Sequence, residues 1–124
     1  MEEWEIRVTH EWRRWFDGQD ASTRRQIIWS LDRLAEGGPV LGRPMVDRIE
    51  GSRIHNLKEL RPGSAGNSEI RILFAFDPWR SAIMLVGGDK SGDWSGWYRR
   101  MIPQAEELFG QYLKERQAEK EGRE

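Results

Sequence analysis

The sequence predicts an α+β domain with a small, mostly antiparallel sheet, two N-terminal helices and one C-terminal helix, in the order β-α-α-β-β-β-α. Apolar side chains alternate with a period of two near the N-terminus and again after residue 50. Between these segments, and after residue 93, apolar side chains follow the spacing of a helix. Successive strands joined by short connections usually pair antiparallel, which favours this kind of sheet.

The first third of the chain contains one predicted strand and two predicted helices. Residues 4–9 alternate apolar and polar side chains, which is typical of a short strand with one buried face. Residues 10–19 carry tryptophan and phenylalanine at helical spacing. Asp20 and Ser22 are residue types that favour helix N-caps, and an apolar stripe then continues to about Glu36. These patterns predict a short helix followed by a longer one.

The middle of the chain is predicted to supply the rest of the sheet. Gly37-Gly38-Pro39 ends the second helix. Residues 40–50 have no clear period, which predicts an extended connector lying over the core. Residues 54–61 alternate again and predict a second strand. Residues 68–77 and 81–86 are rich in apolar residues that favour strands, and they complete the predicted sheet.

The C-terminal part of the chain is predicted to be helical. The glycine-rich residues 87–92 predict a loop that ends the sheet. Residues 94–119 then carry apolar side chains suited to packing a helix, and Pro103 marks an interruption or a new first turn. We expect a single domain over residues 1–113, with residues 114–124 forming a charged tail that frays.

Length and composition limit the class of protein. The chain has 124 residues, which fits one domain, and its 7 Trp, 4 Phe and 2 Tyr supply bulky side chains for a core. It has no cysteine, and its two histidines lie far apart, so we expect no disulfide, metal site or cofactor. No apolar run approaches the roughly 20 residues that span a bilayer, and the N-terminus lacks a signal-peptide pattern. We therefore expect a cytoplasmic protein that has no contact with a membrane.

Charge is unevenly distributed along the chain. The net charge of −1 argues against a dedicated duplex-DNA binder. Residues 53–100, however, carry 8 basic and 5 acidic side chains, whereas the segments on both sides are acidic. Most of the basic residues are arginine, whose planar guanidinium group suits phosphate, although a GC-rich genome accounts for this content equally well. The basic residues of the central segment are therefore the first candidates for binding a phosphate.

Arg71 interrupts an otherwise apolar strand pattern. It shares its parity with Leu73 and Ala75, so it is expected on the same face of the strand as these residues. An arginine at such a position needs an ion-pair partner or a solvent-filled concavity, because an unpaired buried charge is costly. Two interpretations stay open. Arg71 either pairs with Glu59 or Glu69, or it contacts a phosphate bidentately.

The basic residues favour chemistry on a phosphodiester. If the predicted strands are neighbours, Lys58, Arg71 and Lys90 converge on one face or rim of the sheet. The sequence has no serine nucleophile elbow, P-loop or dinucleotide-binding glycine motif, and no clear carboxylate pair. In RNA, a 2′-hydroxyl attacks the neighbouring phosphate, and arginine stabilises the charge that develops. Clustering with other cations would lower the pKa of Lys58 or Lys90 and make that lysine usable as a base.

Three ordered sequence blocks resemble a known family. They are L-K-E-L-R-P-G at residues 57–63, S-E-I-R-I-L-F-A-F-D-P at 68–78 and G-D-K-S-G-D-W-S-G-W-Y at 88–98, followed by I-P-Q-A at 102–105. Together they resemble the RelE/ParE superfamily of bacterial toxins, and most of all its HigB-like, phage-derived branch. The resemblance covers about residues 4–113. It implies a RelE-like fold, ribosome-dependent cleavage of mRNA that inhibits translation, and neutralisation by a helix-turn-helix antitoxin.

The same resemblance implies a set of site residues. The catalytic candidates are Lys58, Arg61, Arg71 and Lys90, and the candidates for RNA binding are Arg53, Trp94, Trp97, Tyr98 and Arg99. Trp94 and Trp97 are equally compatible with packing, and Asp89-Lys90 with a solvated turn. Other HigB-like members use histidine or aspartate near the end of the last strand, where this chain has only Asp89. A ParE-like toxin that poisons DNA gyrase, and a protein-binding module without catalysis, stay as alternatives.

Overall fold

A computed structural model describes residues 3–63 and 66–122 of the chain. Within this part, five strands form one sheet in the order β1-β5-β4-β3-β2. The strands are β1 (Glu5–Val8), β2 (Val46–Arg48), β3 (Lys58–Leu60), β4 (Ile70–Phe76) and β5 (Ser81–Asp89). β1 runs parallel to β5, and the other neighbouring strands pair antiparallel. The predicted mostly antiparallel sheet is therefore confirmed.

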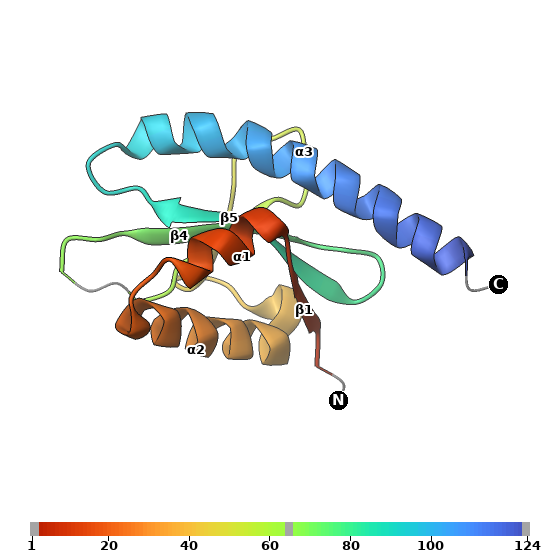
Figure 1. Ribbon diagram of the computed structural model, residues 1–124, viewed down its shortest axis with the longest axis horizontal. Helices are drawn as coiled ribbons and strands as arrows, with labels where there is room; N and C mark the ends of the chain where they lie inside the picture. Colours follow the sequence, from red (N-terminus) through yellow and green to blue (C-terminus); the bar gives the residue numbers. More distant parts are fainter. Residues whose placement is uncertain (1–2, 64–65, 123–124) are drawn as a thin grey trace.

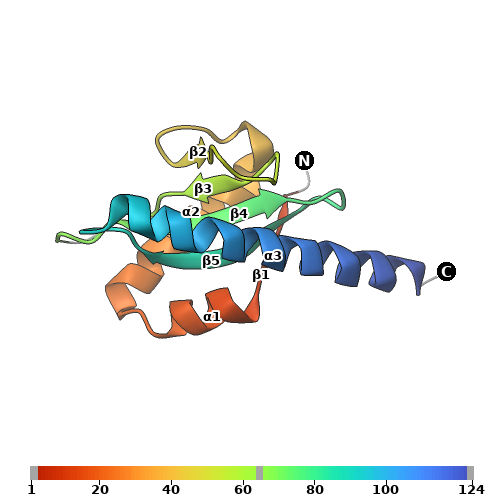
Figure 2. The ribbon, with the colours of Figure 1, turned by 90° about the horizontal axis from the view of Figure 1, so that it is seen from above.

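The helices cover both faces of this sheet. α1 (His10–Asp17) and α2 (Ala21–Gly37) lie on one face, and α3 (Trp94–Glu121) crosses the other (Figure 1). A short 3-10 helix, η1 (Gly38–Val40), follows α2. The view from above shows α3 running past the end of the sheet (Figure 2). The predicted helices are thus present in the predicted order, and none of the described helices is long and apolar enough to cross a membrane.

Side-chain caps fix the starts of the two N-terminal helices. The Thr9 hydroxyl accepts a hydrogen bond from the backbone N–H of Trp12 at 3.0 Å, at the start of α1. At the start of α2, the Asp20 carboxylate accepts from the backbone N–H of Thr23 at 2.7 Å. Of the two predicted caps, Asp20 is therefore the N-cap, and Ser22 lies inside the helix.

Two apolar cores form on opposite faces of the sheet. Along β4, Ile72 and Phe74 point into the core beneath α1 and α2, whereas Leu73 and Ala75 point into the core beneath α3. All four side chains are fully buried. Burial of a side chain as large as Phe74 stabilises a fold by about 1.5–3 kcal/mol. The alternation confirms the predicted parity, and it places Arg71 on the face that α3 covers.

Two adjacent glycines let β5 continue where the sequence predicted a loop. A Cβ atom on Gly87 would lie 2.4 Å from the ring of Trp15 in α1, and one on Gly88 would lie 2.4 Å from the indole nitrogen of Trp97 in α3. Neighbouring strand residues face opposite sides, so each glycine leaves room for one tryptophan, on opposite faces of the sheet. The prediction that residues 87–92 end the sheet is wrong, because β5 extends to Asp89.

Two further predictions about the sheet need correction. The connector predicted over residues 40–50 contains strand β2, which pairs with β3 and forms an edge of the sheet. The strand predicted over residues 54–61 is shorter, because only Lys58–Leu60 join the ladder. Both strands have three residues. A hydrophobic pattern cannot identify strands this short, because their pairing depends on neighbouring strands.

The C-terminal helix is continuous. Pro103 lies inside α3 without ending it, and residues 114–121 continue the helix where the sequence predicted a frayed tail. Arg116 is buried in this last part, with its Nε 3.8 Å from the Asp77 carboxylate at the β4–β5 turn. The Tyr112 hydroxyl donates to the same carboxylate. Tyr112 and Arg116 therefore connect α3 to the β4–β5 turn through the Asp77 carboxylate.

Candidate active site

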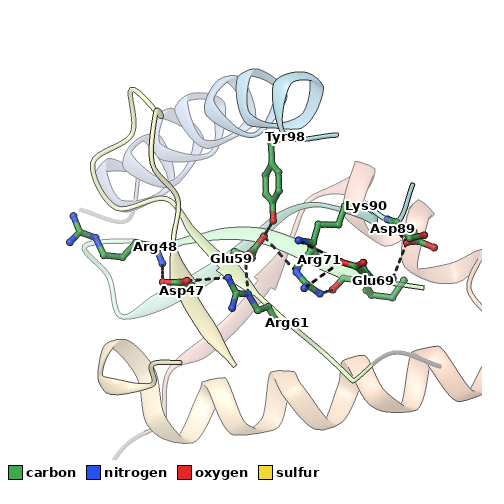
Figure 3. A network of polar contacts seen from close by, with 11 residues as sticks. Asp47, Arg48, Glu59, Arg61, Glu69, Arg71, Asp89, Lys90 and Tyr98 are labelled. Carbon is green, nitrogen blue, oxygen red and sulfur yellow. Dashed lines mark hydrogen bonds and ion pairs between the residues drawn. The ribbon is translucent and has the colours of Figure 1, made fainter. Parts of the chain in front are cut away.

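Five polar residues, from β3 and the residue after it, β4, the end of β5 and α3, meet on the face of the sheet that α3 covers (Figure 3). We call them the Glu59 cluster: Glu59, Arg61, Arg71, Lys90 and Tyr98. The β3–β4 register pairs Glu59 with Leu73, which places Glu59 on the same face as Arg71. Lys90 directly follows β5, and Tyr98 points from the first turns of α3 toward Glu59 (Figure 3).

Glu59 lies at the centre of the cluster and is only 2% exposed. The Arg61 Nε donates to one carboxylate oxygen at 2.9 Å. The other oxygen accepts from the Tyr98 hydroxyl and lies 3.8 Å from the Arg71 Nε. A buried carboxylate is costly unless it is paired and hydrogen-bonded, and these three partners supply both.

Arg71 is held in place while part of its guanidinium group stays available. Its Nη1 donates to the backbone carbonyl of Ile70 at 2.8 Å, and its Nη2 lies 4.0 Å from the Glu69 carboxylate. The Nε is buried and has no hydrogen-bond partner among the described residues. Both ion pairs proposed from the sequence, with Glu59 and with Glu69, are thus present at long range. The side chain is 16% exposed, so an anion can still reach it.

Lys90 is a buried lysine under an exposed tryptophan. The residue is 4% exposed, and its Nζ lies 3.3 Å from the centre of the Trp94 ring and 3.6 Å from Glu69. Burial and the positive charge of Arg71 lower the pKa of Lys90, against the opposing attraction of Glu59 and Glu69. The alternative of a solvated turn is therefore wrong for Lys90. Its ammonium group is a better proton donor than that of an ordinary lysine.

Tyr98 serves the cluster as a hydrogen-bond donor. Burial, the hydrogen bond to Glu59 and the negative charge of that carboxylate raise the pKa of Tyr98 far above its ordinary value. The phenol therefore keeps its proton throughout the physiological pH range. This proton fixes one oxygen of Glu59 and leaves the other oxygen facing Arg61.

An open groove of about 570 Å³ adjoins the cluster. It lies between the segment around β2 and the first turns of α3, and it shares Glu59, Arg61 and Tyr98 with the cluster. Asp47 on β2 accepts from the Arg61 Nη2 at 3.0 Å, so Arg61 bridges two carboxylates. A ligand in this groove would therefore lie next to the cluster.

Lys58 does not join the other catalytic candidates. The register pairs Lys58 with Phe74, whose side chain lies in the core beneath α1 and α2. Paired residues of an antiparallel ladder share a face, so Lys58 faces away from the Glu59 cluster. The expected convergence of Lys58, Arg71 and Lys90 is wrong for Lys58. The structure brings Arg61, Arg71 and Lys90 together.

The residues predicted to bind RNA lie in different environments. Trp97 is buried against the sheet beneath α3, so the stacking role predicted for it is wrong and the packing alternative is right. Trp94 is 60% exposed, and because Lys90 lies over one face of its ring, only the other face is available to stack on a base. Arg53 is exposed but pairs with Glu106 at 3.1 Å, and Arg99 is exposed on α3.

Sequence reasoning missed the central role of Glu59, which it treated only as a partner of Arg71. One signal was available. In the segment L-K-E-L-R, Glu59 shares the parity of Leu57, which is buried, and of Arg61. A carboxylate on the buried face of a strand needs partners or a function.

Within residues 3–63 and 66–122, no group of three or more histidine, cysteine or acidic residues could hold a metal ion.

Residues 14–110 match the family described as phage-derived Gp49-like proteins. The chain belongs to this family. It is 52% identical over 99 residues to the Mycobacterium tuberculosis (strain ATCC 25618 / H37Rv) protein named toxin HigB2, and 51% identical over 100 residues to toxin HigB3 of the same strain. These matches cover 80% and 81% of this chain. They span about half of HigB2 (49%) and 85% of HigB3.

Solved structures of RelE proteins share the fold. A mutant of the E. coli toxin RelE in the free state superposes with a TM-score of 0.57 at 10% identity, covering 81% of this chain and 99% of that one. The toxin–antitoxin complex RelBE2 of Mycobacterium tuberculosis contains a chain with a TM-score of 0.52 at 17% identity, covering 70% and 98%. The resemblance to HigB proteins is confirmed by the two relatives, and the α+β RelE-like fold that it implies is confirmed by the solved structures.

Proposed function

We propose that this Gp49-like protein is the toxin of a type II toxin–antitoxin system, and that it inhibits translation by cleaving mRNA on the ribosome without a metal ion. The observation that carries this proposal is the Glu59 cluster, which combines three cations, a buried carboxylate and a phenol beside an open groove. The names of the relatives HigB2 and HigB3 support the toxin assignment. A ribosomal target would place the protein in the cytoplasm.

Arg71 and Arg61 bind the scissile phosphate. Both guanidinium groups lie against Glu59, at 3.8 Å and 2.9 Å, so an anion that reaches them enters a site already arranged for negative charge. A planar guanidinium group binds two phosphate oxygens at once, and it stabilises the extra charge of the transition state. Arg71 is 16% exposed, and among the described residues its Nη2 has only the Glu69 carboxylate near it, at 4.0 Å, so this end of its guanidinium group is the principal phosphate contact.

Glu59 and Lys90 carry the protons. The 2′-oxygen bonds to phosphorus as its proton passes to Glu59, and the bond from phosphorus to the 5′-oxygen breaks as Lys90 gives that oxygen a proton. The products are a 2′,3′-cyclic phosphate and a 5′-hydroxyl end.

A helix-turn-helix antitoxin is the proposed partner, and the ribosome with its mRNA is the proposed target. The RelBE2 neighbour is itself a toxin–antitoxin complex, which supports a partner of the antitoxin class. Basic groups of the cluster favour an acidic partner segment, whose association should slow as salt screens the attraction. An association rate independent of ionic strength would show that these charges do not steer the partner.

Expression of the chain alone, and together with the neighbouring gene that is proposed to encode its antitoxin, tests the function. We expect growth arrest without that gene, together with new mRNA ends inside translated frames. Arg71→Ala should abolish both effects, whereas Arg13→Ala, which removes an exposed arginine on α1, should retain them. Growth arrest with intact mRNA would indicate a gyrase-type target, and no arrest at all would indicate a binding module. Either outcome would reject the ribonuclease.

A further inference from the structure

The groove beside the Glu59 cluster has apolar lining and a volume that suit a nucleotide. Ile49, which follows β2, and Ile102 on α3 both line it, and both are only partly buried against the core. Each isoleucine therefore presents apolar surface that the protein leaves uncovered. The volume of about 570 Å³ falls within the roughly 300–1,000 Å³ of pockets that hold small ligands. An aromatic base can pack against this apolar surface.

The polar groups of the groove differ in how they are engaged. Asp47 accepts from Arg61 at 3.0 Å and from the backbone N–H of Arg48 at 2.8 Å, and it lies 3.7 Å from the Nε of Arg43. Glu50 also lines the groove, is exposed, and makes no hydrogen bond or ion pair with any described residue. Its carboxylate is therefore available to a ligand, whereas that of Asp47 is already used.

We propose that the groove binds a guanine nucleotide of the RNA, next to the scissile phosphate, with Glu50 reading the base. This inference rests on the proposed function, because the groove and the cluster share Glu59 and Arg61. A nucleotide in the groove thus has its phosphate within the cluster. Guanine presents two adjacent donors, its ring N–H and its amino group, which match the two oxygens of a carboxylate. Cytosine, adenine and uracil lack this pair of parallel donors.

The exposed Arg43 adds a positive charge to the groove, in addition to that of Arg61. Its side chain is 78% exposed at the rim of the groove, and Arg61 lies on the side of the cluster. RNA phosphates on both sides of the bound base would therefore each meet an arginine. Single-strand recognition commonly combines such backbone contacts with hydrogen bonds to the edge of an unstacked base.

Binding of mononucleotides to the purified chain tests the groove without requiring cleavage. We expect guanosine 5′-monophosphate to shift the NMR methyl signals of Ile49 and Ile102, and cytidine 5′-monophosphate to bind at least tenfold more weakly. Glu50→Gln should weaken binding of the guanine nucleotide about tenfold, since a bidentate base contact contributes about 1–3 kcal/mol. Glu36→Gln, which changes an exposed carboxylate on α2, is the matched control. Equal affinity for both nucleotides, or unshifted isoleucine signals, would overturn the assignment.

Mapping of cleavage sites separates this inference from the proposed function. We expect the wild-type chain to cut next to guanine and Glu50→Gln to cut with a weaker preference for guanine, whereas Glu36→Gln should cut like the wild type. An unchanged preference in the variant would overturn the role of Glu50 while leaving the ribonuclease intact. Absence of cleavage by the wild-type chain, with selective binding of the guanine nucleotide retained, would reject the ribonuclease and uphold the nucleotide site.

Discussion

Replacing Arg71 by alanine separates a catalytic role from a structural one, because the two roles predict losses of different size. Breaking an isolated buried ion pair costs about 3–5 kcal/mol. Here Glu59 would keep the Arg61 Nε at 2.9 Å and the Tyr98 hydroxyl, so its carboxylate is not orphaned. We therefore expect Arg71→Ala to lower the free energy of unfolding by only about 1–2 kcal/mol.

This destabilisation is too small to remove activity by unfolding. For a domain of this length it lowers the Tm by about 3–10 °C. Even if the total stability were only about 5 kcal/mol, about 99% of the variant would stay folded. If Arg71 contacts the scissile phosphate, its loss should instead slow cleavage by about 10²–10³-fold, as for other preorganised charge-stabilising donors. Arg71→Lys should recover little, because an ammonium group cannot replace the two-pronged contact.

Thermal melting and toxicity measured on the same variants decide between the roles. The catalytic account expects Arg71→Ala to melt slightly below the wild type and to be non-toxic at any growth temperature. Arg13→Ala should match the wild type in both measurements. A destabilised Arg71→Ala variant that remains fully toxic when expressed at low temperature would refute the catalytic role of Arg71.

Three further predictions concern packing and protonation. Gly88→Ala should destabilise the fold by about 1–3 kcal/mol in denaturant unfolding, because its Cβ would meet Trp97 at 2.4 Å, whereas Gly110→Ala, with nothing within 4 Å, should stabilise α3 by up to about 1 kcal/mol. As the pH rises, the cleavage rate should decline at a pH below the ordinary lysine pKa of about 10.4, because Lys90 then loses its proton. The residual rate of Lys90→Arg should lack this decline. Burial alone would raise the pKa of Glu106, but hydrogen bonds from a backbone N–H, a hydroxyl and a guanidinium lower it. The carboxylate therefore stabilises the fold above about pH 4.3, and the Tm difference between wild type and Glu106→Gln should shrink as the pH falls below that value.

The sequence was sufficient for the helices and for the longer strands. Apolar periodicity identified α1, α2 and β4, because each of these elements buries a regular stripe or alternates between two cores. It failed at β2 and at the end of β5. β2 exists only because it pairs with β3, and Gly87 and Gly88 stay in the sheet because tryptophans from other elements fill the space above and below them. Such long-range contacts leave no local pattern.

The candidate site was predictable only where the local sequence pattern identifies a residue, and not where long-range contacts place it. Arg71 and Lys90 were found because a charge within or directly after an apolar strand is conspicuous. Lys58 was misplaced because the face that a strand residue occupies depends on the register with its neighbour. Glu59 was undervalued because its partners Tyr98 and Arg71 are distant in sequence, and only the packing of α3 on the sheet brings them to it.

The chemistry of the RNA ends tests the central claim most directly. The Glu59 cluster, acting through the 2′-hydroxyl, must leave 5′-hydroxyl ends on the downstream fragments. Sequencing of mRNA after induction of the chain, with separate capture of 5′-hydroxyl and 5′-phosphate ends, distinguishes the products. We expect new 5′-hydroxyl ends inside translated frames with the wild-type chain and none with Arg71→Ala. New ends that carry 5′-phosphate, or intact mRNA during growth arrest, would contradict cleavage by this cluster.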